Sequence, residues 1–172
     1  MELLIGFKKF LNIKTIFLAA TLLIQSCNRE VPTHFSDKAL SDTFVSIDDK
    51  EVTFAQILDL YKGENIFVDV WASWCSDCLK SLPKIKELQK QYPEMVFLFL
   101  SVDKKIDNWK NGITKHKIYG EHYFVKSGWD GDFGEFIDLD WTPRYMIIDK
   151  EQNIKLFEAV KTNDDKLIEA LQ

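Results

Sequence analysis

The sequence predicts one α/β domain, with a mixed central sheet and helices on both faces, behind a short N-terminal targeting segment. Three observations support this. Strand-like and helix-like segments alternate from residue 44 to residue 116, two strongly apolar runs have the composition of buried strands, and the chain closes with a hairpin and a helix. A length of 172 residues suits one such domain plus an appendage.

The first 26 residues have the features of an export signal. Three lysines precede an apolar run over 16–24, which is shorter than the roughly 20 residues that cross a bilayer. Ser26 and Cys27 follow, a pairing that resembles the lipobox of bacterial lipoproteins, in which the cysteine carries lipid and becomes the first residue of the mature chain. An ordinary cleaved signal and an uncleaved anchor are the alternatives. Each of them places the domain outside the cytoplasm, and the lipobox implies a lipid anchor on the periplasmic side of a bacterial membrane.

The charge of the chain argues against polyanionic partners. The formal net charge is −5, and loss of residues 1–26 removes three of the 22 basic and one of the 27 acidic residues, which leaves −7. An acidic product has no electrostatic basis for binding nucleic acid or for docking on anionic lipid through a basic face. We therefore expect no nucleic-acid partner, and membrane contact through the lipid on Cys27.

Residues 28–43 are polar and aperiodic, which predicts a lipid-anchored tether over 27–43 and a folded domain over 44–172. The expected elements are, in order, a strand at 44–47, a helix at 54–62, a strand at 66–71, a helix from Cys75 to Gln91, a strand at 95–102, a helix at 104–116, a short strand and a helical turn (136–139) within 118–140, a hairpin of strands at 144–149 and 154–160, and a helix from an Asn163 cap to Leu171.

Local signals justify the early elements. Phe44 to Ile47 alternates as a short strand does, and Thr53 with Gln56 forms a capping-box pattern for the helix at 54–62. The run 66–71 is β-branched and apolar, as in a strand buried on both faces. The next helix is predicted from apolar residues at helical spacing: Leu79, Leu82, Ile85 and Leu88.

The later elements follow from equally local signals. Pro93 ends the long helix, and an apolar strand follows it. Trp109 and Ile113 indicate an amphipathic helix, and a glycine-spaced loop follows within 118–140. The residues 151–153 form the turn of the hairpin.

Cys75 and Cys78 carry the chemistry. With Cys27 assigned to lipid, they form a single pair separated by two residues, whereas structural disulfide frameworks use several bridges over longer loops. Cys75 opens a helix, where free backbone N–H groups and the helix dipole favour a thiolate. Cys78 lies one turn on, within disulfide reach, so we predict that Cys75 attacks and Cys78 resolves.

Trp-Cys-x-x-Cys after a strand resembles the thioredoxin superfamily, and Trp71 to Cys75 with the tethered layout resembles its exported TlpA/ResA-type branch. The resemblance covers residues 44–172 and implies a thioredoxin-like fold. It also implies a client site at the cis-proline loop of Thr142 and Pro143, and Trp74 is expected to contact the client because of its position beside Cys75. Ser76 and Asp77 replace the usual residues between the cysteines and are predicted to tune the redox potential. Trp129 is expected either beside Trp74 in an apolar platform or in the core.

Asp69 interrupts an apolar strand six residues before Cys75. It matches the buried aspartate of thioredoxin, and Ser81 stands where many anchored relatives carry a glutamate. A buried lone carboxyl has a raised pKa, which suits a base for Cys78. The alternative is a solvated aspartate at the strand edge. Thus Cys75, Cys78 and Asp69 are the predicted catalytic residues.

The predicted activity is protein-disulfide exchange without cofactor or metal. Reduction of clients is favoured, and oxidation is the alternative direction. By resemblance, partners include disulfide or dithiol clients such as apocytochrome c and a membrane thiol reductase as electron donor. Zinc is disfavoured because no second Cys/His pair exists. A thioredoxin-fold copper chaperone, using Cys75, Cys78 and a histidine such as His122, is the alternative from another class.

Overall fold

The computed structural model describes residues 30–172, and Pro32–Gln172 form one compact unit. Its strands are β1 (Thr43–Ser46), β2 (Glu51–Thr53), β3 (Ile66–Trp71), β4 (Val96–Ser101), β5 (Glu121–Val125), β6 (Arg144–Ile148) and β7 (Ile154–Ala159). They form one sheet in the order β2-β1-β5-β4-β3-β6-β7, in which β3, β4 and β5 are parallel and the remaining pairings are antiparallel. The predicted mixed sheet is confirmed.

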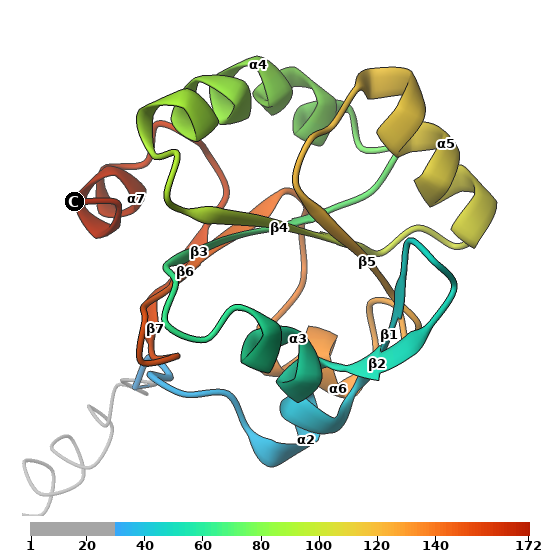
Figure 1. Cartoon of the computed structure of the whole chain (residues 1–172), viewed down its shortest axis with the longest axis horizontal. Helices are drawn as coiled ribbons and strands as arrows, with labels where there is room; N and C mark the ends of the chain where they lie inside the picture. The colour runs from blue at the N-terminus through green and yellow to red at the C-terminus, as the bar shows by residue number, and fades with distance from the viewer. Residues whose placement is uncertain (1–29) are drawn as a thin grey trace, which may run out of the picture. The chain divides into compact units, whose positions relative to one another are not determined.

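The helices in the described part of the chain are α2 (Asp37–Ser41), α3 (Phe54–Leu60), α4 (Ser76–Gln91), α5 (Ile106–His116), α6 (Asp132–Phe136) and α7 (Asp165–Ala170). Figure 1 shows α4 and α5 on one face of the sheet and α2, α3 and α6 on the other. The last helix, α7, packs against β6 and β7. The predicted layering, with helices on both faces, is therefore confirmed.

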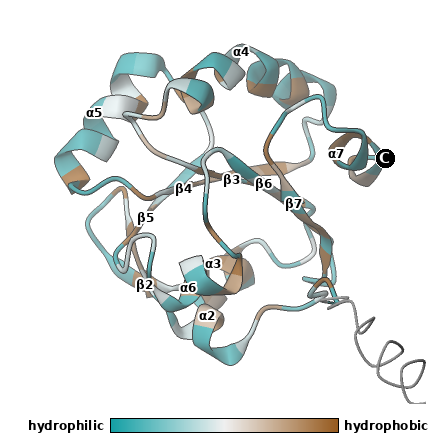
Figure 2. Cartoon of the chain, turned by 180° about the vertical axis from the view of Figure 1, so that it is seen from behind, coloured by the Kyte–Doolittle hydropathy of each residue, from teal (hydrophilic) through white to brown (hydrophobic). Residues whose placement is uncertain are grey.

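Local signals explain the helices α3 and α4. The Thr53 hydroxyl accepts from the Gln56 N–H at 3.2 Å and the Gln56 side chain accepts from the Thr53 N–H at 2.9 Å, so the predicted capping box is present. Hydrophilic and hydrophobic residues alternate along the α4 ribbon (Figure 2), as expected of a helix with one buried stripe. That stripe consists of Cys78, Leu82, Ile85 and Leu88.

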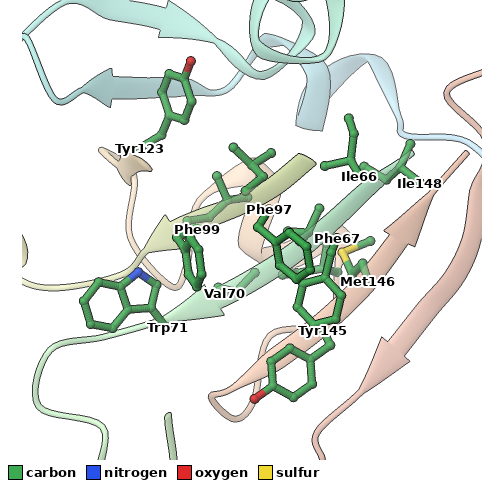
Figure 3. Close-up of a cluster of buried hydrophobic side chains, with 14 of the residues drawn as sticks. Ile66, Phe67, Val70, Trp71, Phe97, Phe99, Tyr123, Tyr145, Met146 and Ile148 are labelled. Carbon is green, nitrogen blue, oxygen red and sulfur yellow. The ribbon is translucent and has the colours of Figure 1, made fainter. Parts of the chain in front are cut away.

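β3 lies at the centre of the core and is buried along its whole length. The Phe67 ring lies 5.1 Å from that of Phe97 and 5.4 Å from that of Tyr145, and Figure 3 shows this aromatic cluster. Because side chains alternate along a strand, Phe67, Asp69 and Trp71 share one face of the sheet. Trp71 lies beside Gly112 of α5, which identifies that face as the one covered by α4 and α5.

The region predicted as a tether differs from the prediction. Residues 32–43 belong to the compact unit, and α2 buries Ala39 completely. The Phe35 ring lies 4.8 Å from Phe54 and 6.4 Å from Phe133. A five-residue helix is too short to show hydrophobic periodicity, and its one local signal is the N-cap residue Ser36. The expected signal peptide and lipidated Cys27 lie outside the described residues.

Three smaller features also differ from the prediction. β2 was not predicted, because a strand of three residues has too little alternation to detect. The helical turn expected at 136–139 is α6, which begins at Asp132. The last helix is capped by Asp164 rather than Asn163, since the Asp164 carboxylate accepts from the Lys166 N–H at 2.9 Å.

Candidate active site

Cys75 and Cys78 form a disulfide at the start of α4, with their Cα atoms 5.3 Å apart. β3 ends at Trp71 and a three-residue loop carries the chain to Cys75, the N-cap of α4. The Cys78 N–H donates to Cys75 Sγ at 3.0 Å. Such N–H groups stabilise negative charge, so the geometry favours a thiolate on Cys75 when the disulfide opens.

A buried aspartate that the sequence reasoning missed fixes the loop before Cys75. Asp103, just after β4, accepts from the Ser73 N–H at 2.8 Å and from the Ser73 hydroxyl at 2.7 Å. The Ser101 hydroxyl also donates to it, at 2.9 Å. β3 and β4 are parallel neighbours, so their carboxyl ends meet. A polar Ser-x-Asp directly after the second apolar strand was the signal that could have indicated this contact.

The Thr142–Pro143 peptide bond is cis, as the resemblance predicts. The Thr142 carbonyl oxygen lies 3.4 Å from Cys75 Sγ, although the two residues are far apart in the sequence. The structure therefore brings this loop against the first cysteine, which is where the resemblance predicted it.

Arg144 fixes the segment that leads into this loop, a role that no local sequence pattern indicates. Its side chain is buried, and its guanidinium donates to the carbonyl oxygens of Ile137 at 2.6 Å and Asp138 at 3.0 Å. It also donates to the Asp140 carboxylate at 2.7 Å. An arginine fork that satisfies three acceptors is well suited to hold an irregular segment in one conformation.

An apolar groove of about 400 Å³ runs beside Cys75. Its aromatic walls are Trp74, Trp129 and Trp141. The Trp74 and Trp129 rings stack with centroids 6.4 Å apart, and Trp129 also packs on the core, so it occupies both expected positions. Trp74 and Trp141 are each 58% exposed. Trp141 and Asp140 line the groove and were not predicted from the sequence.

A second cavity, of about 420 Å³, lies on the other side of Trp141. It is bounded by the start of α4, the Pro143 loop and the segment after β7. Ser81 and Tyr145 are among its lining residues, and Lys80 and Lys161 contribute charge. The disulfide region is therefore flanked by one mainly aromatic hollow and one with several polar groups.

Asp69 is only 2% exposed, which rules out the solvated position at a strand edge. Burial raises the pKa of its carboxyl to about 8. Its Oδ1 atom has no hydrogen-bond partner among residues 30–172. In the sheet it lies opposite Tyr145 of β6 and beside Phe99 of β4. A carboxyl with these properties can take up a proton near neutral pH.

Asp77, which is predicted to tune the redox potential, has a charged neighbour. It is exposed at the mouth of both hollows, and Lys80 Nζ lies 3.1 Å from its Oδ1. Exposed ion pairs are weak, but the lysine partly offsets the field of Asp77 at the sulfurs. Ser76 is also exposed and lines the aromatic groove.

The ligands that a copper chaperone would need do not gather in the described part of the chain. No three His, Cys, Asp or Glu side chains there are placed to hold one metal ion. His122 instead stacks on Phe99 at 5.1 Å and its Nε2 lies 3.1 Å from the Ile118 carbonyl oxygen. Over residues 30–172, none of the helices has both the length and the apolar character to cross a membrane.

Comparison with known proteins identifies relatives in both sequence and structure. Residues 63–154, more than half of the chain, match a family described as thioredoxin-like. A solution structure from Bacteroides vulgatus, described as a thiol-disulfide oxidoreductase, is 30% identical with a TM-score of 0.65, over 79% of this chain and 87% of that one. The thiol:disulfide interchange protein DsbE of Allochromatium vinosum is 28% identical over 152 residues, 81% of this chain and 77% of that protein.

A protein of Haemophilus influenzae is 34% identical over 74 residues, which span 43% of this chain and 42% of that protein. The homologues thus include thiol–disulfide oxidoreductases with a Cys-x-x-Cys active site, the motif that Cys75 and Cys78 form here. The chain therefore belongs to the thioredoxin-like family, among its TlpA/DsbE/ResA-like thiol–disulfide oxidoreductases.

Proposed function

We propose that the chain is an exported, lipid-anchored thiol–disulfide oxidoreductase that reduces disulfides of client proteins. The observation that carries the proposal is the position of the two sulfurs. Cys75 lines the aromatic groove, whereas Cys78 belongs to the buried stripe of α4, on the side of the sheet that holds Asp69. One cysteine can thus meet a client while the other stays behind it.

Reduction proceeds in two exchanges. The Cys75 thiolate attacks a client disulfide; the client S–S bond breaks, one client sulfur leaves as a thiolate, and the other is joined to Cys75. Cys78 then gives its proton to Asp69 and attacks Cys75 Sγ, which forms the Cys75–Cys78 disulfide and releases the second client thiolate. Two electrons pass to the client, and a membrane thiol reductase would reduce the pair again.

The client chain is expected to lie across the groove. Trp74 and Trp141 offer exposed aromatic area on either side of Cys75, and the backbone at Thr142 and Pro143 borders the sulfur. Exposed tryptophans beside a reactive atom are typical anchors for a protein partner. Unfolded or extended clients, among them apocytochrome c, satisfy this geometry because their cysteines and neighbouring apolar side chains are accessible.

The carboxylate of Asp77 favours the reducing direction. Negative charge near the sulfurs disfavours a thiolate, and forming the disulfide removes that thiolate. Asp77 follows Cys75 by two residues. It therefore favours the oxidised protein, which makes the reduced protein the better donor of electrons. A redox titration against glutathione should give a potential nearer to that of thioredoxin than to that of DsbA.

Trapping of mixed disulfides tests the assignment of the two cysteines. Cys78→Ala should accumulate client proteins on Cys75, since the resolving thiol is absent, whereas Cys75→Ala should capture none. The two variants are matched controls, because each keeps one thiol and loses the other. Capture of clients by Cys75→Ala to the same extent would contradict the assignment.

The anchor is tested separately. In a bacterium grown with labelled fatty acid, the wild-type protein should carry label and Cys27→Ser should not. An unlabelled wild-type protein recovered in the soluble fraction would contradict lipidation, and it would leave the chemistry of the domain unaffected.

A further inference from the structure

The neighbour of Asp69 across the sheet is a tyrosine. Asp69 and Tyr145 are directly opposite in the antiparallel pair of β3 and β6. Opposite residues in such a pair project from the same face, with Cβ atoms about 5 Å apart. The Tyr145 ring also contacts Phe67, two residues before Asp69 on that face (Figure 3). The phenol and the carboxyl therefore share one buried environment under α4.

Both groups are buried without a partner. Tyr145 is fully buried, and neither its hydroxyl nor Oδ1 of Asp69 has a hydrogen-bond partner among residues 30–172. Burial first, and the charge of Asp69 second, raise the pKa of Tyr145. Buried polar groups are normally satisfied, so two unsatisfied ones side by side call for a functional explanation.

Tyr145 and Ser81 of α4 both line the second cavity, which lies beside Trp141. The Ser81 hydroxyl donates to the Cys78 carbonyl oxygen at 2.7 Å, so toward Tyr145 it can only accept. Ser81 acts to lower the pKa of Tyr145, against the larger effects of burial and of Asp69, and no hydrogen bond joins the two hydroxyls. Tyr145 thus lies between Asp69 and a cavity large enough for several water molecules.

We propose that Tyr145, together with Ser81, is the positioning residue for Asp69: its hydroxyl solvates the carboxylate and connects it to the cavity, so that Asp69 loses its proton to solvent and then accepts one from Cys78. This rests on the proposed disulfide exchange. The proton balance is simple. Asp69 gives one proton to cavity water by way of the Tyr145 hydroxyl and takes one from the Cys78 thiol. The Cys78 sulfur then attacks Cys75 Sγ, which forms the Cys75–Cys78 disulfide and releases the client sulfur as a thiolate.

The other surroundings of Asp69 offer no comparable route. Beside it in β4 lies the apolar ring of Phe99, and Phe67 precedes it on the same face. On the α4 side the titratable group is Cys78, and the charged groups of the cavity are Asp77, Lys80 and Lys161. Tyr145 is thus the polar residue that is both opposite Asp69 in the sheet and part of the cavity wall.

Tyr145→Phe tests the proposal in the full-length protein, because it keeps the ring and removes the hydroxyl. Tyr123→Phe is the matched control, since Tyr123 is also buried but projects from the opposite face of the sheet (Figure 3), with its hydroxyl 3.4 Å from that of Tyr61. A mixed disulfide between Cys75 and a chromophoric peptide would be formed, and its resolution by Cys78 followed from pH 6 to pH 10.

At pH 7, resolution should be about tenfold slower in Tyr145→Phe and unchanged in Tyr123→Phe. The tenfold loss is a part of the roughly 10²- to 10⁴-fold rate enhancement that a positioned base contributes. The pH–rate profile of Tyr145→Phe should move to higher pH, because the carboxylate has lost a polar neighbour. Removing an unsatisfied hydroxyl should leave the midpoint of unfolding equal or higher. A protein that is no less stable and yet slower cannot owe its slowness to misfolding.

Ser81→Ala should move the profile in the same direction by a smaller factor, since the serine acts through Tyr145. Profiles of Tyr145→Phe and Ser81→Ala that coincide with the wild type would overturn the proposal. Failure of the proposed function itself would look different: the wild-type mixed disulfide would not resolve, or Cys75→Ala would capture clients.

Discussion

The two sides of the disulfide reverse the usual distribution of side chains. On the side of the groove, large aromatic rings are exposed, with Trp74 and Trp141 each 58% accessible. On the side of the sheet, Asp69 and Tyr145, whose polar groups would be well hydrated at the surface, are almost completely buried. Exposed apolar area favours covering by a partner, and a buried carboxyl favours proton uptake.

This contrast indicates a division of labour between two features of one short motif. The groove concerns the first exchange, in which Cys75 meets a client. The buried side concerns the second, in which Cys78 must lose a proton before it attacks. Changes on one side should therefore alter one step and leave the other intact, and the following predictions are ordered by the size of the expected effect.

The largest expected effect concerns stability and pH. Burial holds the pKa of Asp69 at about 8, against an ordinary value of 3.8, so the folded state binds this proton more tightly than the unfolded state. The stabilisation is complete below pH 4 and is lost as pH rises through 8, and the total is on the order of 5 kcal/mol. Urea unfolding of the oxidised protein between pH 4 and pH 9 measures it.

Asp69→Asn is the control for that measurement, because asparagine has the same shape and does not titrate. From pH 4 to pH 9, the free energy of unfolding of the wild type should fall steadily relative to that of Asp69→Asn. Parallel pH dependences in the two proteins would show that the carboxyl has access to water.

Asp69→Asn should also slow the second exchange by about 100-fold, the lower end of what a positioned base contributes. Attack of Cys75 on a model disulfide should be largely retained, because Asp69 lies on the other side of the pair. Single-turnover mixing with a labelled peptide disulfide separates the two phases. Unchanged resolution would mean that Asp69 is only structural.

On the groove side, Trp141→Ala should slow attack on a protein client by about tenfold, as expected for a truncated aromatic anchor at an interface. Attack on a small disulfide that does not fill the groove should change little. Tyr119→Ala is the matched control, since Tyr119 is also an exposed aromatic residue but does not line the groove. Equal losses in the two variants would argue against a client site at Trp141.

The smallest expected effect is on the redox potential. Asp77→Asn should lower the pKa of Cys75 and make the potential less negative, by at most about 20 mV because Lys80 already offsets part of the charge. Lys80→Met should act in the opposite direction. A potential that stays constant or moves more negative in Asp77→Asn would show that Asp77 does not tune the pair.

Much of the fold could be predicted because its signals are local. The bounds of β3, the placing of Cys75 at a helix start and the capping box at Thr53 all follow from a few neighbouring residues. The burial of Asp69 could also be anticipated, since a strand with apolar residues on both faces has no solvated position in its middle.

The remaining features depend on register between distant segments. That Tyr145 is opposite Asp69 depends on how β6 pairs with β3, and a shift of one residue would place Tyr145 on the other face. The contacts of Arg144 with the carbonyls of 137 and 138 depend on an irregular segment without periodicity. No local pattern specifies such contacts, so the positioning residues of the site were found only in the structure.

The division of labour is tested most directly by a double-mutant cycle of Trp141→Ala and Asp69→Asn, in which both exchanges are timed in one stopped-flow experiment with a protein client. Attack should be slow only in the proteins that lack Trp141, resolution should be slow only in those that lack Asp69, and the double variant should show both losses with a coupling below about 0.5 kcal/mol. Slowing of both exchanges by either single substitution would contradict the account.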